Sequence, residues 1–437
     1  MVAGSLTTVV VVVVVAAGAG FAGVGVGCCK RAAKPAAVDK QLTGRGAGKG
    51  TREVARGAAR APLREREAAA AADRIKPPQR CFPGDTPLSP PRSHDSLVDR
   101  AGARFEAADF ETALVCAEEA AQENPDSVEA HHGRALALAQ LGQLNEARDA
   151  ITRALALDPD DPETLAAAAD LYVNRLGPST QLTEIGLAYA ERASRLLRRG
   201  QQPRLAARVA LIEGQALNDL GRASEALPRI EHALQIRPDD VETRYERAVA
   251  YFEVCKFTEA KAGLEWVLKR DPDHAYGHHY LGLTLERSDE AAARPHFARA
   301  RALRPRDFGV PVTLAPADFQ KLVDEVVAQL PAEARDALTR LPLEITDLPA
   351  LADLTAEDPP LSPTVLGLFR GIPEGVTCKP PEGTAVPPQA IVLYRRNLAR
   401  AVVDRAELKR EVRKTLLHEI GHMKGEDDAA LRARGLE

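Results

Sequence analysis

Aromatic side chains, tryptophan and methionine are scarce in this chain. Aromatics make up 4% of its 437 residues, with one Trp and two Met. Aromatic side chains favour strands, whereas alanine and leucine, which are abundant here, favour helices. The composition therefore argues against a β-sandwich and for closely packed helices, and the length allows two to four domains.

A charge excess of either sign is also missing. The chain has 58 basic and 62 acidic residues, for a formal net charge of −4. Bulk binding to nucleic acid normally needs a basic excess. We therefore expect no nucleic-acid partner.

The six cysteines lack the spacing of a zinc ribbon or of a compact disulfide framework. Cys116 and Cys255 fall within apolar helical patterns, which predicts small core residues. The pattern favours a reducing compartment. The full set is Cys28, Cys29, Cys81, Cys116, Cys255 and Cys378.

Charged residues are absent from Leu6 to Gly27, a run of mostly Val, Ala and Gly that is long enough to cross a bilayer. Lys30, Arg31 and Lys34 follow at once, and the positive-inside rule then places the main body in the cytosol. We interpret residues 1–29 as a hydrophobic membrane segment, with an over-extended translation start as the alternative. A secretory signal is disfavoured because a charged n-region is missing. The expected location is cytoplasmic, with or without an anchor.

Large apolar residues are nearly absent from residues 30–92. Such a segment cannot bury enough surface to offset its ordering entropy. Six prolines keep its second half extended, so we predict a disordered basic linker. These prolines are Pro77, Pro78, Pro83, Pro87, Pro90 and Pro91.

Prolines that end helices recur with a regular period in residues 93–306. Pro125 and Pro159 are 34 residues apart, as are Pro238 and Pro272, and Pro305 follows 33 residues later. Small residues hold matching places before each proline, such as Ala147 and Ala226. Small residues let two antiparallel helices approach closely, so the period predicts stacked helix pairs.

This period and these small-residue positions resemble the tetratricopeptide repeat family. Five repeats are clear, and a sixth lies between Pro162 and Pro203, stretched by an insertion around 176–180. The resemblance implies an α-solenoid whose concave groove receives peptides or protein partners.

One stretch near the C-terminus carries the candidate chemistry, Thr415 to Asp428, which reads TLLHEIGHMKGEDD. On a helix, His418 and His422 are one turn apart and share a face, so both imidazoles can bind one Zn²⁺. Glu419 is rotated by roughly 100° from His418 and suits the general base that takes a proton from a metal-bound water.

The residues after the second histidine supply a third ligand. Gly425 permits a left-handed turn that ends the helix and returns the chain. Asp428, six residues after His422, can then offer a carboxylate oxygen. Two histidines and one carboxylate leave the fourth zinc position open, which is typical of a catalytic site.

The elements around this motif predict a small mixed domain. Apolar periodicity predicts a helix at 319–330, and Asp404 with Glu407 forms a capping box that opens the motif helix. Strands are expected at Leu343–Thr346 and Ile391–Tyr394, the second being the stronger.

With these residues in place, Phe319 to Leu431 resembles the small zincin-like metallopeptidases of bacteria. The resemblance implies an α/β domain over residues 316–437, with zinc on His418, His422 and Asp428 and with Glu419 as base. Nine residues follow Asp428, so an electrophile is expected upstream, with Tyr394, Arg395 and Arg396 as candidates. Ile391–Tyr394 is expected to be an edge strand that receives substrate by strand addition.

The sequence therefore predicts a mainly α protein, in which a tetratricopeptide α-solenoid precedes a small α/β zincin-like domain. The leading hypothesis is a zinc-dependent peptidase whose repeats recruit protein partners or substrates. The alternative is an interaction scaffold whose zinc domain is catalytically silent or structural.

Overall fold

The computed structural model describes residues 30–31, 80–82, 92–197, 202–356, 358–377 and 388–436. The predicted hydrophobic segment and most of the predicted linker lie outside these residues. No helix in the part described is both long and apolar enough to cross a bilayer. The chain divides into two compact units, and the division falls inside one helix, between Ala250 and Tyr251.

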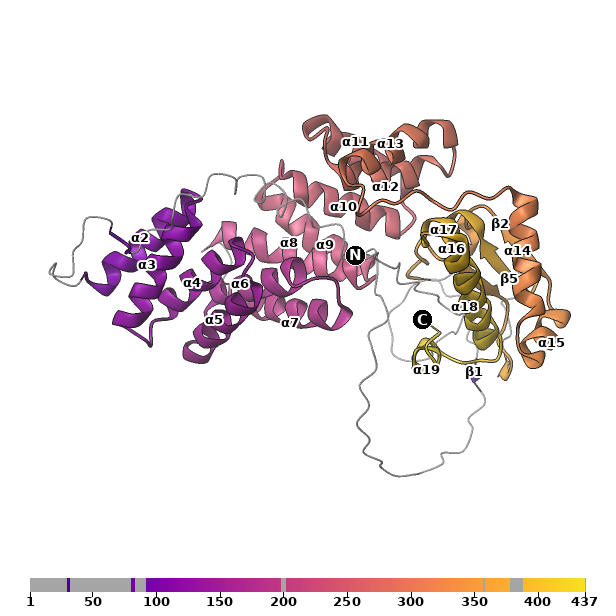
Figure 1. Cartoon of the computed structure of the whole chain (residues 1–437), viewed down its shortest axis with the longest axis horizontal. Helices are drawn as coiled ribbons and strands as arrows, with labels where there is room; N and C mark the ends of the chain where they lie inside the picture. Colours follow the sequence, from indigo (N-terminus) through magenta and orange to yellow (C-terminus); the bar gives the residue numbers. More distant parts are fainter. Residues whose placement is uncertain are drawn as a thin grey trace, which may run out of the picture. The chain divides into compact units, whose positions relative to one another are not determined.

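The first unit is a succession of antiparallel helix pairs (Figure 1). Its last helix begins in this unit and ends in the other. The elements are α2 (His94–Glu106), α3 (Phe110–Glu123), α4 (Val128–Gln140), α5 (Leu144–Leu157), α6 (Pro162–Asp170) continued by the π-helical η3 (Leu171–Arg175), α7 (Thr180–Leu196), α8 (Pro203–Asp219), α9 (Ala223–Ile236) and α10 (Val241–Glu253). The predicted stretched repeat is the pair that contains the π-helical turn.

Small side chains let the two helices of each pair meet closely. Ala147 and Ala226 are fully buried, as the repeat pattern predicts. A Cβ on Gly214 would stand 2.3 Å from Cγ1 of Ile230, so this contact admits only glycine. The predicted helix pairs are thus confirmed, together with the reason for their spacing.

Cys116 is buried in α3, as predicted, but its thiol is not free. It forms a disulfide with Cys81, whose backbone N–H also donates to the Glu119 carboxylate. The cysteine spacing gave no sign of this disulfide, and the bond removes the support that the cysteine pattern gave to a reducing compartment. The bond joins residues 35 positions apart, so it depends on where residues 80–82 dock, which no local spacing shows. Cys255 is half-buried and forms no disulfide, and its Sγ donates a hydrogen bond to the Leu361 carbonyl at 3.6 Å.

The second unit combines further helices with a small sheet (Figure 1). The helices are α11 (Phe257–Arg270), whose last residues count with the first unit, α12 (Ala275–Leu285), α13 (Glu290–Leu303), α14 (Pro316–Ala328), α15 (Ala332–Arg340), α16 (Leu351–Leu354), α17 (Arg395–Arg400), α18 (Arg405–Met423) and α19 (Asp428–Ala433). The strands are β1 (Lys30–Arg31), β2 (Leu343–Thr346), β3 (Gly367–Arg370), β4 (Val376–Thr377) and β5 (Ala390–Tyr394).

The three-stranded sheet has the order β2-β5-β3, and β1 pairs separately with β4. β2 runs parallel to β5, with Leu343 opposite Ile391, and β3 runs antiparallel to it, with Gly367 opposite Leu393. The predicted edge position of Ile391–Tyr394 is therefore wrong. This strand is central and buried along its length, as its unbroken apolar run requires, and β3 is an edge of the sheet.

The two faces of β5 meet different parts of the unit. Ile391 and Leu393 belong to a core that includes residues of α14 and α18. Val392 and Tyr394 belong to a second cluster, against which Cys255 and Phe257 pack. The sheet is covered on both sides, which holds β3 beside α18.

The helix that carries the motif begins and ends as predicted. The Asp404 side chain accepts a hydrogen bond from the backbone N–H of Glu407 at 2.7 Å, and the Glu407 carboxylate accepts one from Val403 at 2.9 Å. Leu416 and Ile420 continue its buried stripe. Gly425, just past its end, has φ +82°, the left-handed conformation expected there.

Candidate metal centre

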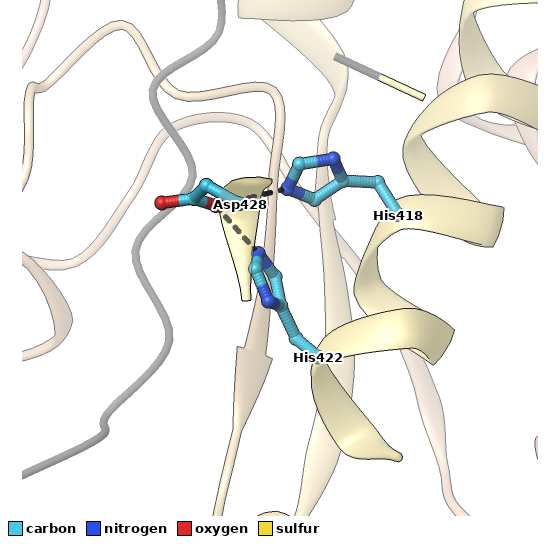
Figure 2. A group of neighbouring side chains, drawn as sticks. All are labelled: His418, His422 and Asp428. Carbon is cyan, nitrogen blue, oxygen red and sulfur yellow. Dashed lines mark ion pairs between the residues drawn. The ribbon is translucent and has the colours of Figure 1, made fainter. Parts of the chain in front are cut away.

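Three side chains from the end of α18 and the start of α19 converge on one point (Figure 2). His422 Nε2 lies 3.3 Å from Asp428 Oδ1, and His418 Nε2 lies 3.8 Å from the same oxygen. One ligand atom from each residue lies within 4.8 Å of the others. Within the described residues this is the one cluster of His, Cys, Asp and Glu with the proximity that a metal ion requires.

The turn after α18 brings the carboxylate back to the histidines. After Gly425, the side chain of Asp427 accepts a hydrogen bond from Ala430 N–H at 2.9 Å and thereby caps α19. Leu431 then packs on α18 at Gly421, where a Cβ would stand 2.3 Å from its Cδ2. The close contact between α18 and α19 places Asp428 against the histidine face of α18.

Backbone carbonyls orient both imidazoles. His418 Nδ1 lies 2.7 Å from the carbonyl oxygen of Leu436, and His422 Nδ1 lies 3.0 Å from that of Glu426. A carbonyl only accepts, so each Nδ1 carries the proton. Each Nε2 therefore presents a lone pair to the centre, which is the tautomer that a metal needs.

Four buried polar atoms at this point have no hydrogen-bond partner among the described residues: His418 Nε2, His422 Nε2, Asp428 Oδ1 and Glu419 Oε1. Buried polar atoms in folded proteins are nearly always paired, so a cluster of unpaired ones indicates a missing ligand. Two imidazole nitrogens and one carboxylate oxygen form a donor set that zinc prefers. The residues present therefore fit a zinc ion.

Glu419 lies beside the three candidate ligands and is fully buried. Its Oε2 accepts a hydrogen bond from the backbone N–H of Phe369 on β3 at 2.7 Å, while Oε1 has no described partner. Gly367, on the same strand, leaves room for it, since a Cβ there would stand 3.1 Å from Oε1. One oxygen is thus fixed and the other is free to take a proton.

The electrostatics of the cluster follow from burial and from mutual contact. Burial raises the pKa of Glu419 to about 8. Burial and then His422 lower the pKa of His418 to about 4. Burial opposes the charged form of His422, but the neighbouring carboxylates of Asp428 and Glu419 outweigh it and raise the pKa of His422. The groups strongly influence one another, as a compact reactive site requires.

The structure brings together all four predicted site residues, and their chemical roles stay predictions. Two of the suggested electrophiles, Arg395 and Arg396, bind the Asp347 carboxylate. The hydroxyl of the third, Tyr394, is buried with no hydrogen-bond partner among the described residues. The sequence reasoning missed the contribution of main-chain groups. The Phe369 N–H and the two carbonyls that orient the histidines are main-chain groups, which nearly any residue type supplies, so the sequence cannot reveal them.

Comparisons with known proteins agree with both halves of this description. Residues 338–436 match the family of zincin-like metallopeptidases. Residues 128–161 and 217–281 match two tetratricopeptide repeat families. The chain therefore combines tetratricopeptide repeats with a zincin-like metallopeptidase domain.

Similar individual proteins share the repeats. A TPR repeat-containing protein of Pseudomonas aeruginosa is 29% identical over 170 residues, which is 38% of this chain and 28% of that protein. The chain thus spans little more than a quarter of the length of this curated relative.

Solved structures also match part of the chain. The pilF protein of Pseudomonas aeruginosa is 17% identical, with a TM-score of 0.41, over 48% of this chain and 92% of that one. TTC0263, a thermophilic TPR protein of Thermus thermophilus, is 22% identical, with a TM-score of 0.35, over 44% of this chain and 99% of that one.

Proposed function

We propose that this protein is a zinc-dependent metallopeptidase that hydrolyses peptide bonds and whose tetratricopeptide repeats recruit protein partners or substrates. In this proposal residues 93–306 recruit, and residues 316–437 form the peptidase domain. The observation that carries it is a set of four buried atoms with no hydrogen-bond partner among the described residues, two imidazole nitrogens and two carboxylate oxygens. The match of residues 338–436 to zincin-like metallopeptidases supports the same reading.

His418, His422 and Asp428 would hold the zinc ion, and Glu419 would act as the general base. Zinc bound in such a site supplies a Lewis acid and makes water nucleophilic near neutral pH. The free Oε1 of Glu419 accepts the proton that the attacking water loses. The Phe369 N–H holds Oε2 meanwhile, so the carboxylate keeps its orientation.

A second candidate function is an interaction scaffold with a catalytically silent or structural zinc domain. The repeats alone would then carry the biological role. One feature favours the enzyme: the proposed ligand set has three members and so leaves a coordination position open beside a carboxylate. A structural zinc site is normally closed by four protein ligands and needs no neighbouring base.

The Glu419→Gln variant separates these functions. The amide keeps an oxygen for the Phe369 N–H but cannot accept a proton at neutral pH. We expect unchanged zinc content and proteolysis of an unfolded protein substrate at least about 100-fold slower, the lower range for loss of a general base. Zinc is measured by elemental analysis and proteolysis by release of soluble peptides.

Glu411→Gln, on the same helix, is the matched control and should keep full activity. Wild-type proteolysis by Glu419→Gln would refute the mechanism. A wild-type protein that binds zinc and cleaves no unfolded substrate would favour the scaffold. The inactive variant also serves as bait, since it should retain substrates that the active enzyme releases.

A further inference from the structure

A cavity of about 460 Å³ lies in the first unit, between α2, α4 and the start of α6. Part of its wall is apolar, with Val98 and Phe105 from α2 and Leu136 from α4. Gly102 and Gly133 add no side chains to it, which leaves the space open. The wall suits the aliphatic part of a side chain.

Four carboxylates also line this cavity: Glu129, Asp158, Asp161 and Glu163. None of them forms an ion pair with a residue in the described ranges. Their hydrogen bonds there are short-range, such as Asp161 accepting from the Thr164 N–H at 2.8 Å. Negative charge is thus concentrated on one cavity, although the chain as a whole is nearly balanced. The positive charge of Arg208 acts on His132, but Arg208 is not among the residues that line the cavity and forms no ion pair with these carboxylates.

The histidine in this wall is an acceptor as well. Thr164 Oγ1 donates its proton to Asp161 Oδ2 at 2.5 Å, so it can only accept from His132 Nδ1 at 3.1 Å. His132 Nε2 then carries the lone pair, and burial lowers the pKa of this histidine and keeps the ring neutral. The side-chain polar groups identified here therefore all present acceptors, and a complementary ligand must bring donors and positive charge.

We propose that this cavity binds an arginine side chain of a protein partner, flanked in the partner by an apolar residue. The inference rests on the proposed recruiting role of the repeats and names the chemistry of the segment recruited. Arginine fits because its guanidinium has five donors and no acceptor, and it stacks on aromatic rings such as that of Phe105. Its methylene stem and the flanking residue cover the apolar wall.

The test measures binding of a fluorescent Gly-Leu-Arg-Leu-Gly peptide to the full chain carrying Glu419→Gln, so that no cleavage interferes. The matched probe replaces arginine by citrulline, which has nearly the same shape and no charge. We expect the citrulline peptide to bind at least about tenfold more weakly, because hydrogen bonds to charged groups contribute at least about 1.5 kcal/mol. Affinity for the arginine peptide should also fall as salt increases.

Two further variants localise the binding. The double variant Glu129→Gln with Glu163→Gln should bind the arginine peptide at least about tenfold more weakly. Glu111→Gln with Glu146→Gln, on exposed positions of α3 and α5, should leave it unchanged. Gly102→Leu should abolish binding by filling the cavity; a Cβ there meets no atom within 4 Å, and leucine favours the helix, so folding is retained.

Equal affinity for the arginine and citrulline peptides would overturn the proposal. Unchanged binding of the arginine peptide by the Glu129 and Glu163 double variant would also overturn it. A full chain that does not bind the arginine peptide would overturn it as well. Because the experiment measures binding without turnover, its failure leaves the peptidase proposal standing. If the protein had no peptidase activity, the peptide-binding measurement would still test the arginine site, because it does not depend on cleavage.

Discussion

At the scale of single residues, main-chain groups prepare the candidate metal centre. The carbonyls of Leu436 and Glu426 fix the two imidazoles, and the Phe369 N–H fixes one oxygen of Glu419. The atoms left over are buried and have no hydrogen-bond partner in the part of the chain that the structure describes, and each such atom costs about 1–3 kcal/mol. A zinc ion would satisfy three of them at once, so its binding and the stability of this region are coupled.

The contact between Gly421 and Leu431 gives a test at this scale. In Gly421→Ala, the new Cβ meets Leu431 Cδ2 at 2.3 Å, so this side chain must shift. Leu431 is fully buried, so we expect α19 to move with it and to displace Asp428. We expect a loss of about 1–3 kcal/mol in unfolding free energy and weaker zinc binding. Urea unfolding and zinc titration measure the two effects.

A second substitution checks the cause. Leu431→Ala combined with Gly421→Ala removes the clash, so zinc affinity should recover relative to the single variant. Gly102→Ala, a helical glycine with open space around it, should be neutral or stabilising. Zinc affinity unaffected by Gly421→Ala would show that α19 does not set the position of Asp428.

At the scale of elements, local signals account for what the sequence could predict. The capping box of Asp404 and Glu407, the buried stripe of α18 and the glycine at its end are readable because each is a neighbour effect. The position of β5 in its sheet was not readable. Five consecutive buried residues fit a central strand, but the central position itself depends on pairing with β2 and β3, which are distant in sequence.

The site shows the same division. His418, Glu419 and His422 share one helix, and a glycine turn returns Asp428, so four residues could be found from spacing alone. The contribution of β3 could not be found in this way, because Phe369 is 50 positions from Glu419 and acts through its backbone. The disulfide of Cys81 also escaped, since residues 80–82 dock through tertiary contacts.

The pair of α12 and α13 carries an element-scale prediction about pH. The His279 ring stacks on Phe308 and meets the edge of Phe297, and burial lowers its pKa to about 3. The folded state therefore stays unprotonated where the unfolded chain, with an ordinary pKa of 6.5, binds a proton. Stability should be lost as pH falls below about 6.5, by roughly 1–2 kcal/mol at pH 5 from this group.

Urea unfolding at pH 7.5 and pH 5 measures this loss. His279→Phe keeps a ring and removes the titrating group, so the difference between the two pH values should shrink. His232→Gln, at an exposed position of α9, should leave it as in the wild type. An unchanged difference in His279→Phe would mean that other groups cause the acid sensitivity.

At the scale of the whole molecule, the second unit joins repeat helices to the three-stranded sheet. Glu286, just after α12, is buried and forms ion pairs with Arg400 and Arg396 of α17. Burial opposes the charge of Glu286 and raises its pKa, while both arginines oppose that rise. α12 and α13 are thus part of the structure that supports the sheet, so the candidate peptidase domain depends on them.

Glu286→Gln tests this dependence. Removing one partner of a buried pair leaves Arg400 without its counter-charge, which costs about 3–5 kcal/mol. We expect earlier unfolding in urea, with loss of proteolysis in the same transition. Glu290→Gln alters an exposed pair with Arg396 and should destabilise the fold much less, because solvent screens such pairs. Similar losses in both variants would contradict a supporting role for the buried pair.

The central claim is that zinc on His418, His422 and Asp428 supports peptide-bond hydrolysis. Its most direct test is a zinc titration of the metal-free full chain, with bound metal and cleavage of an unfolded substrate followed together. The account predicts that cleavage rises with zinc bound to this single cluster, and that Asp428→Ala needs more zinc to reach the same occupancy. Cleavage that persists after chelation, or full zinc occupancy without cleavage, would contradict it.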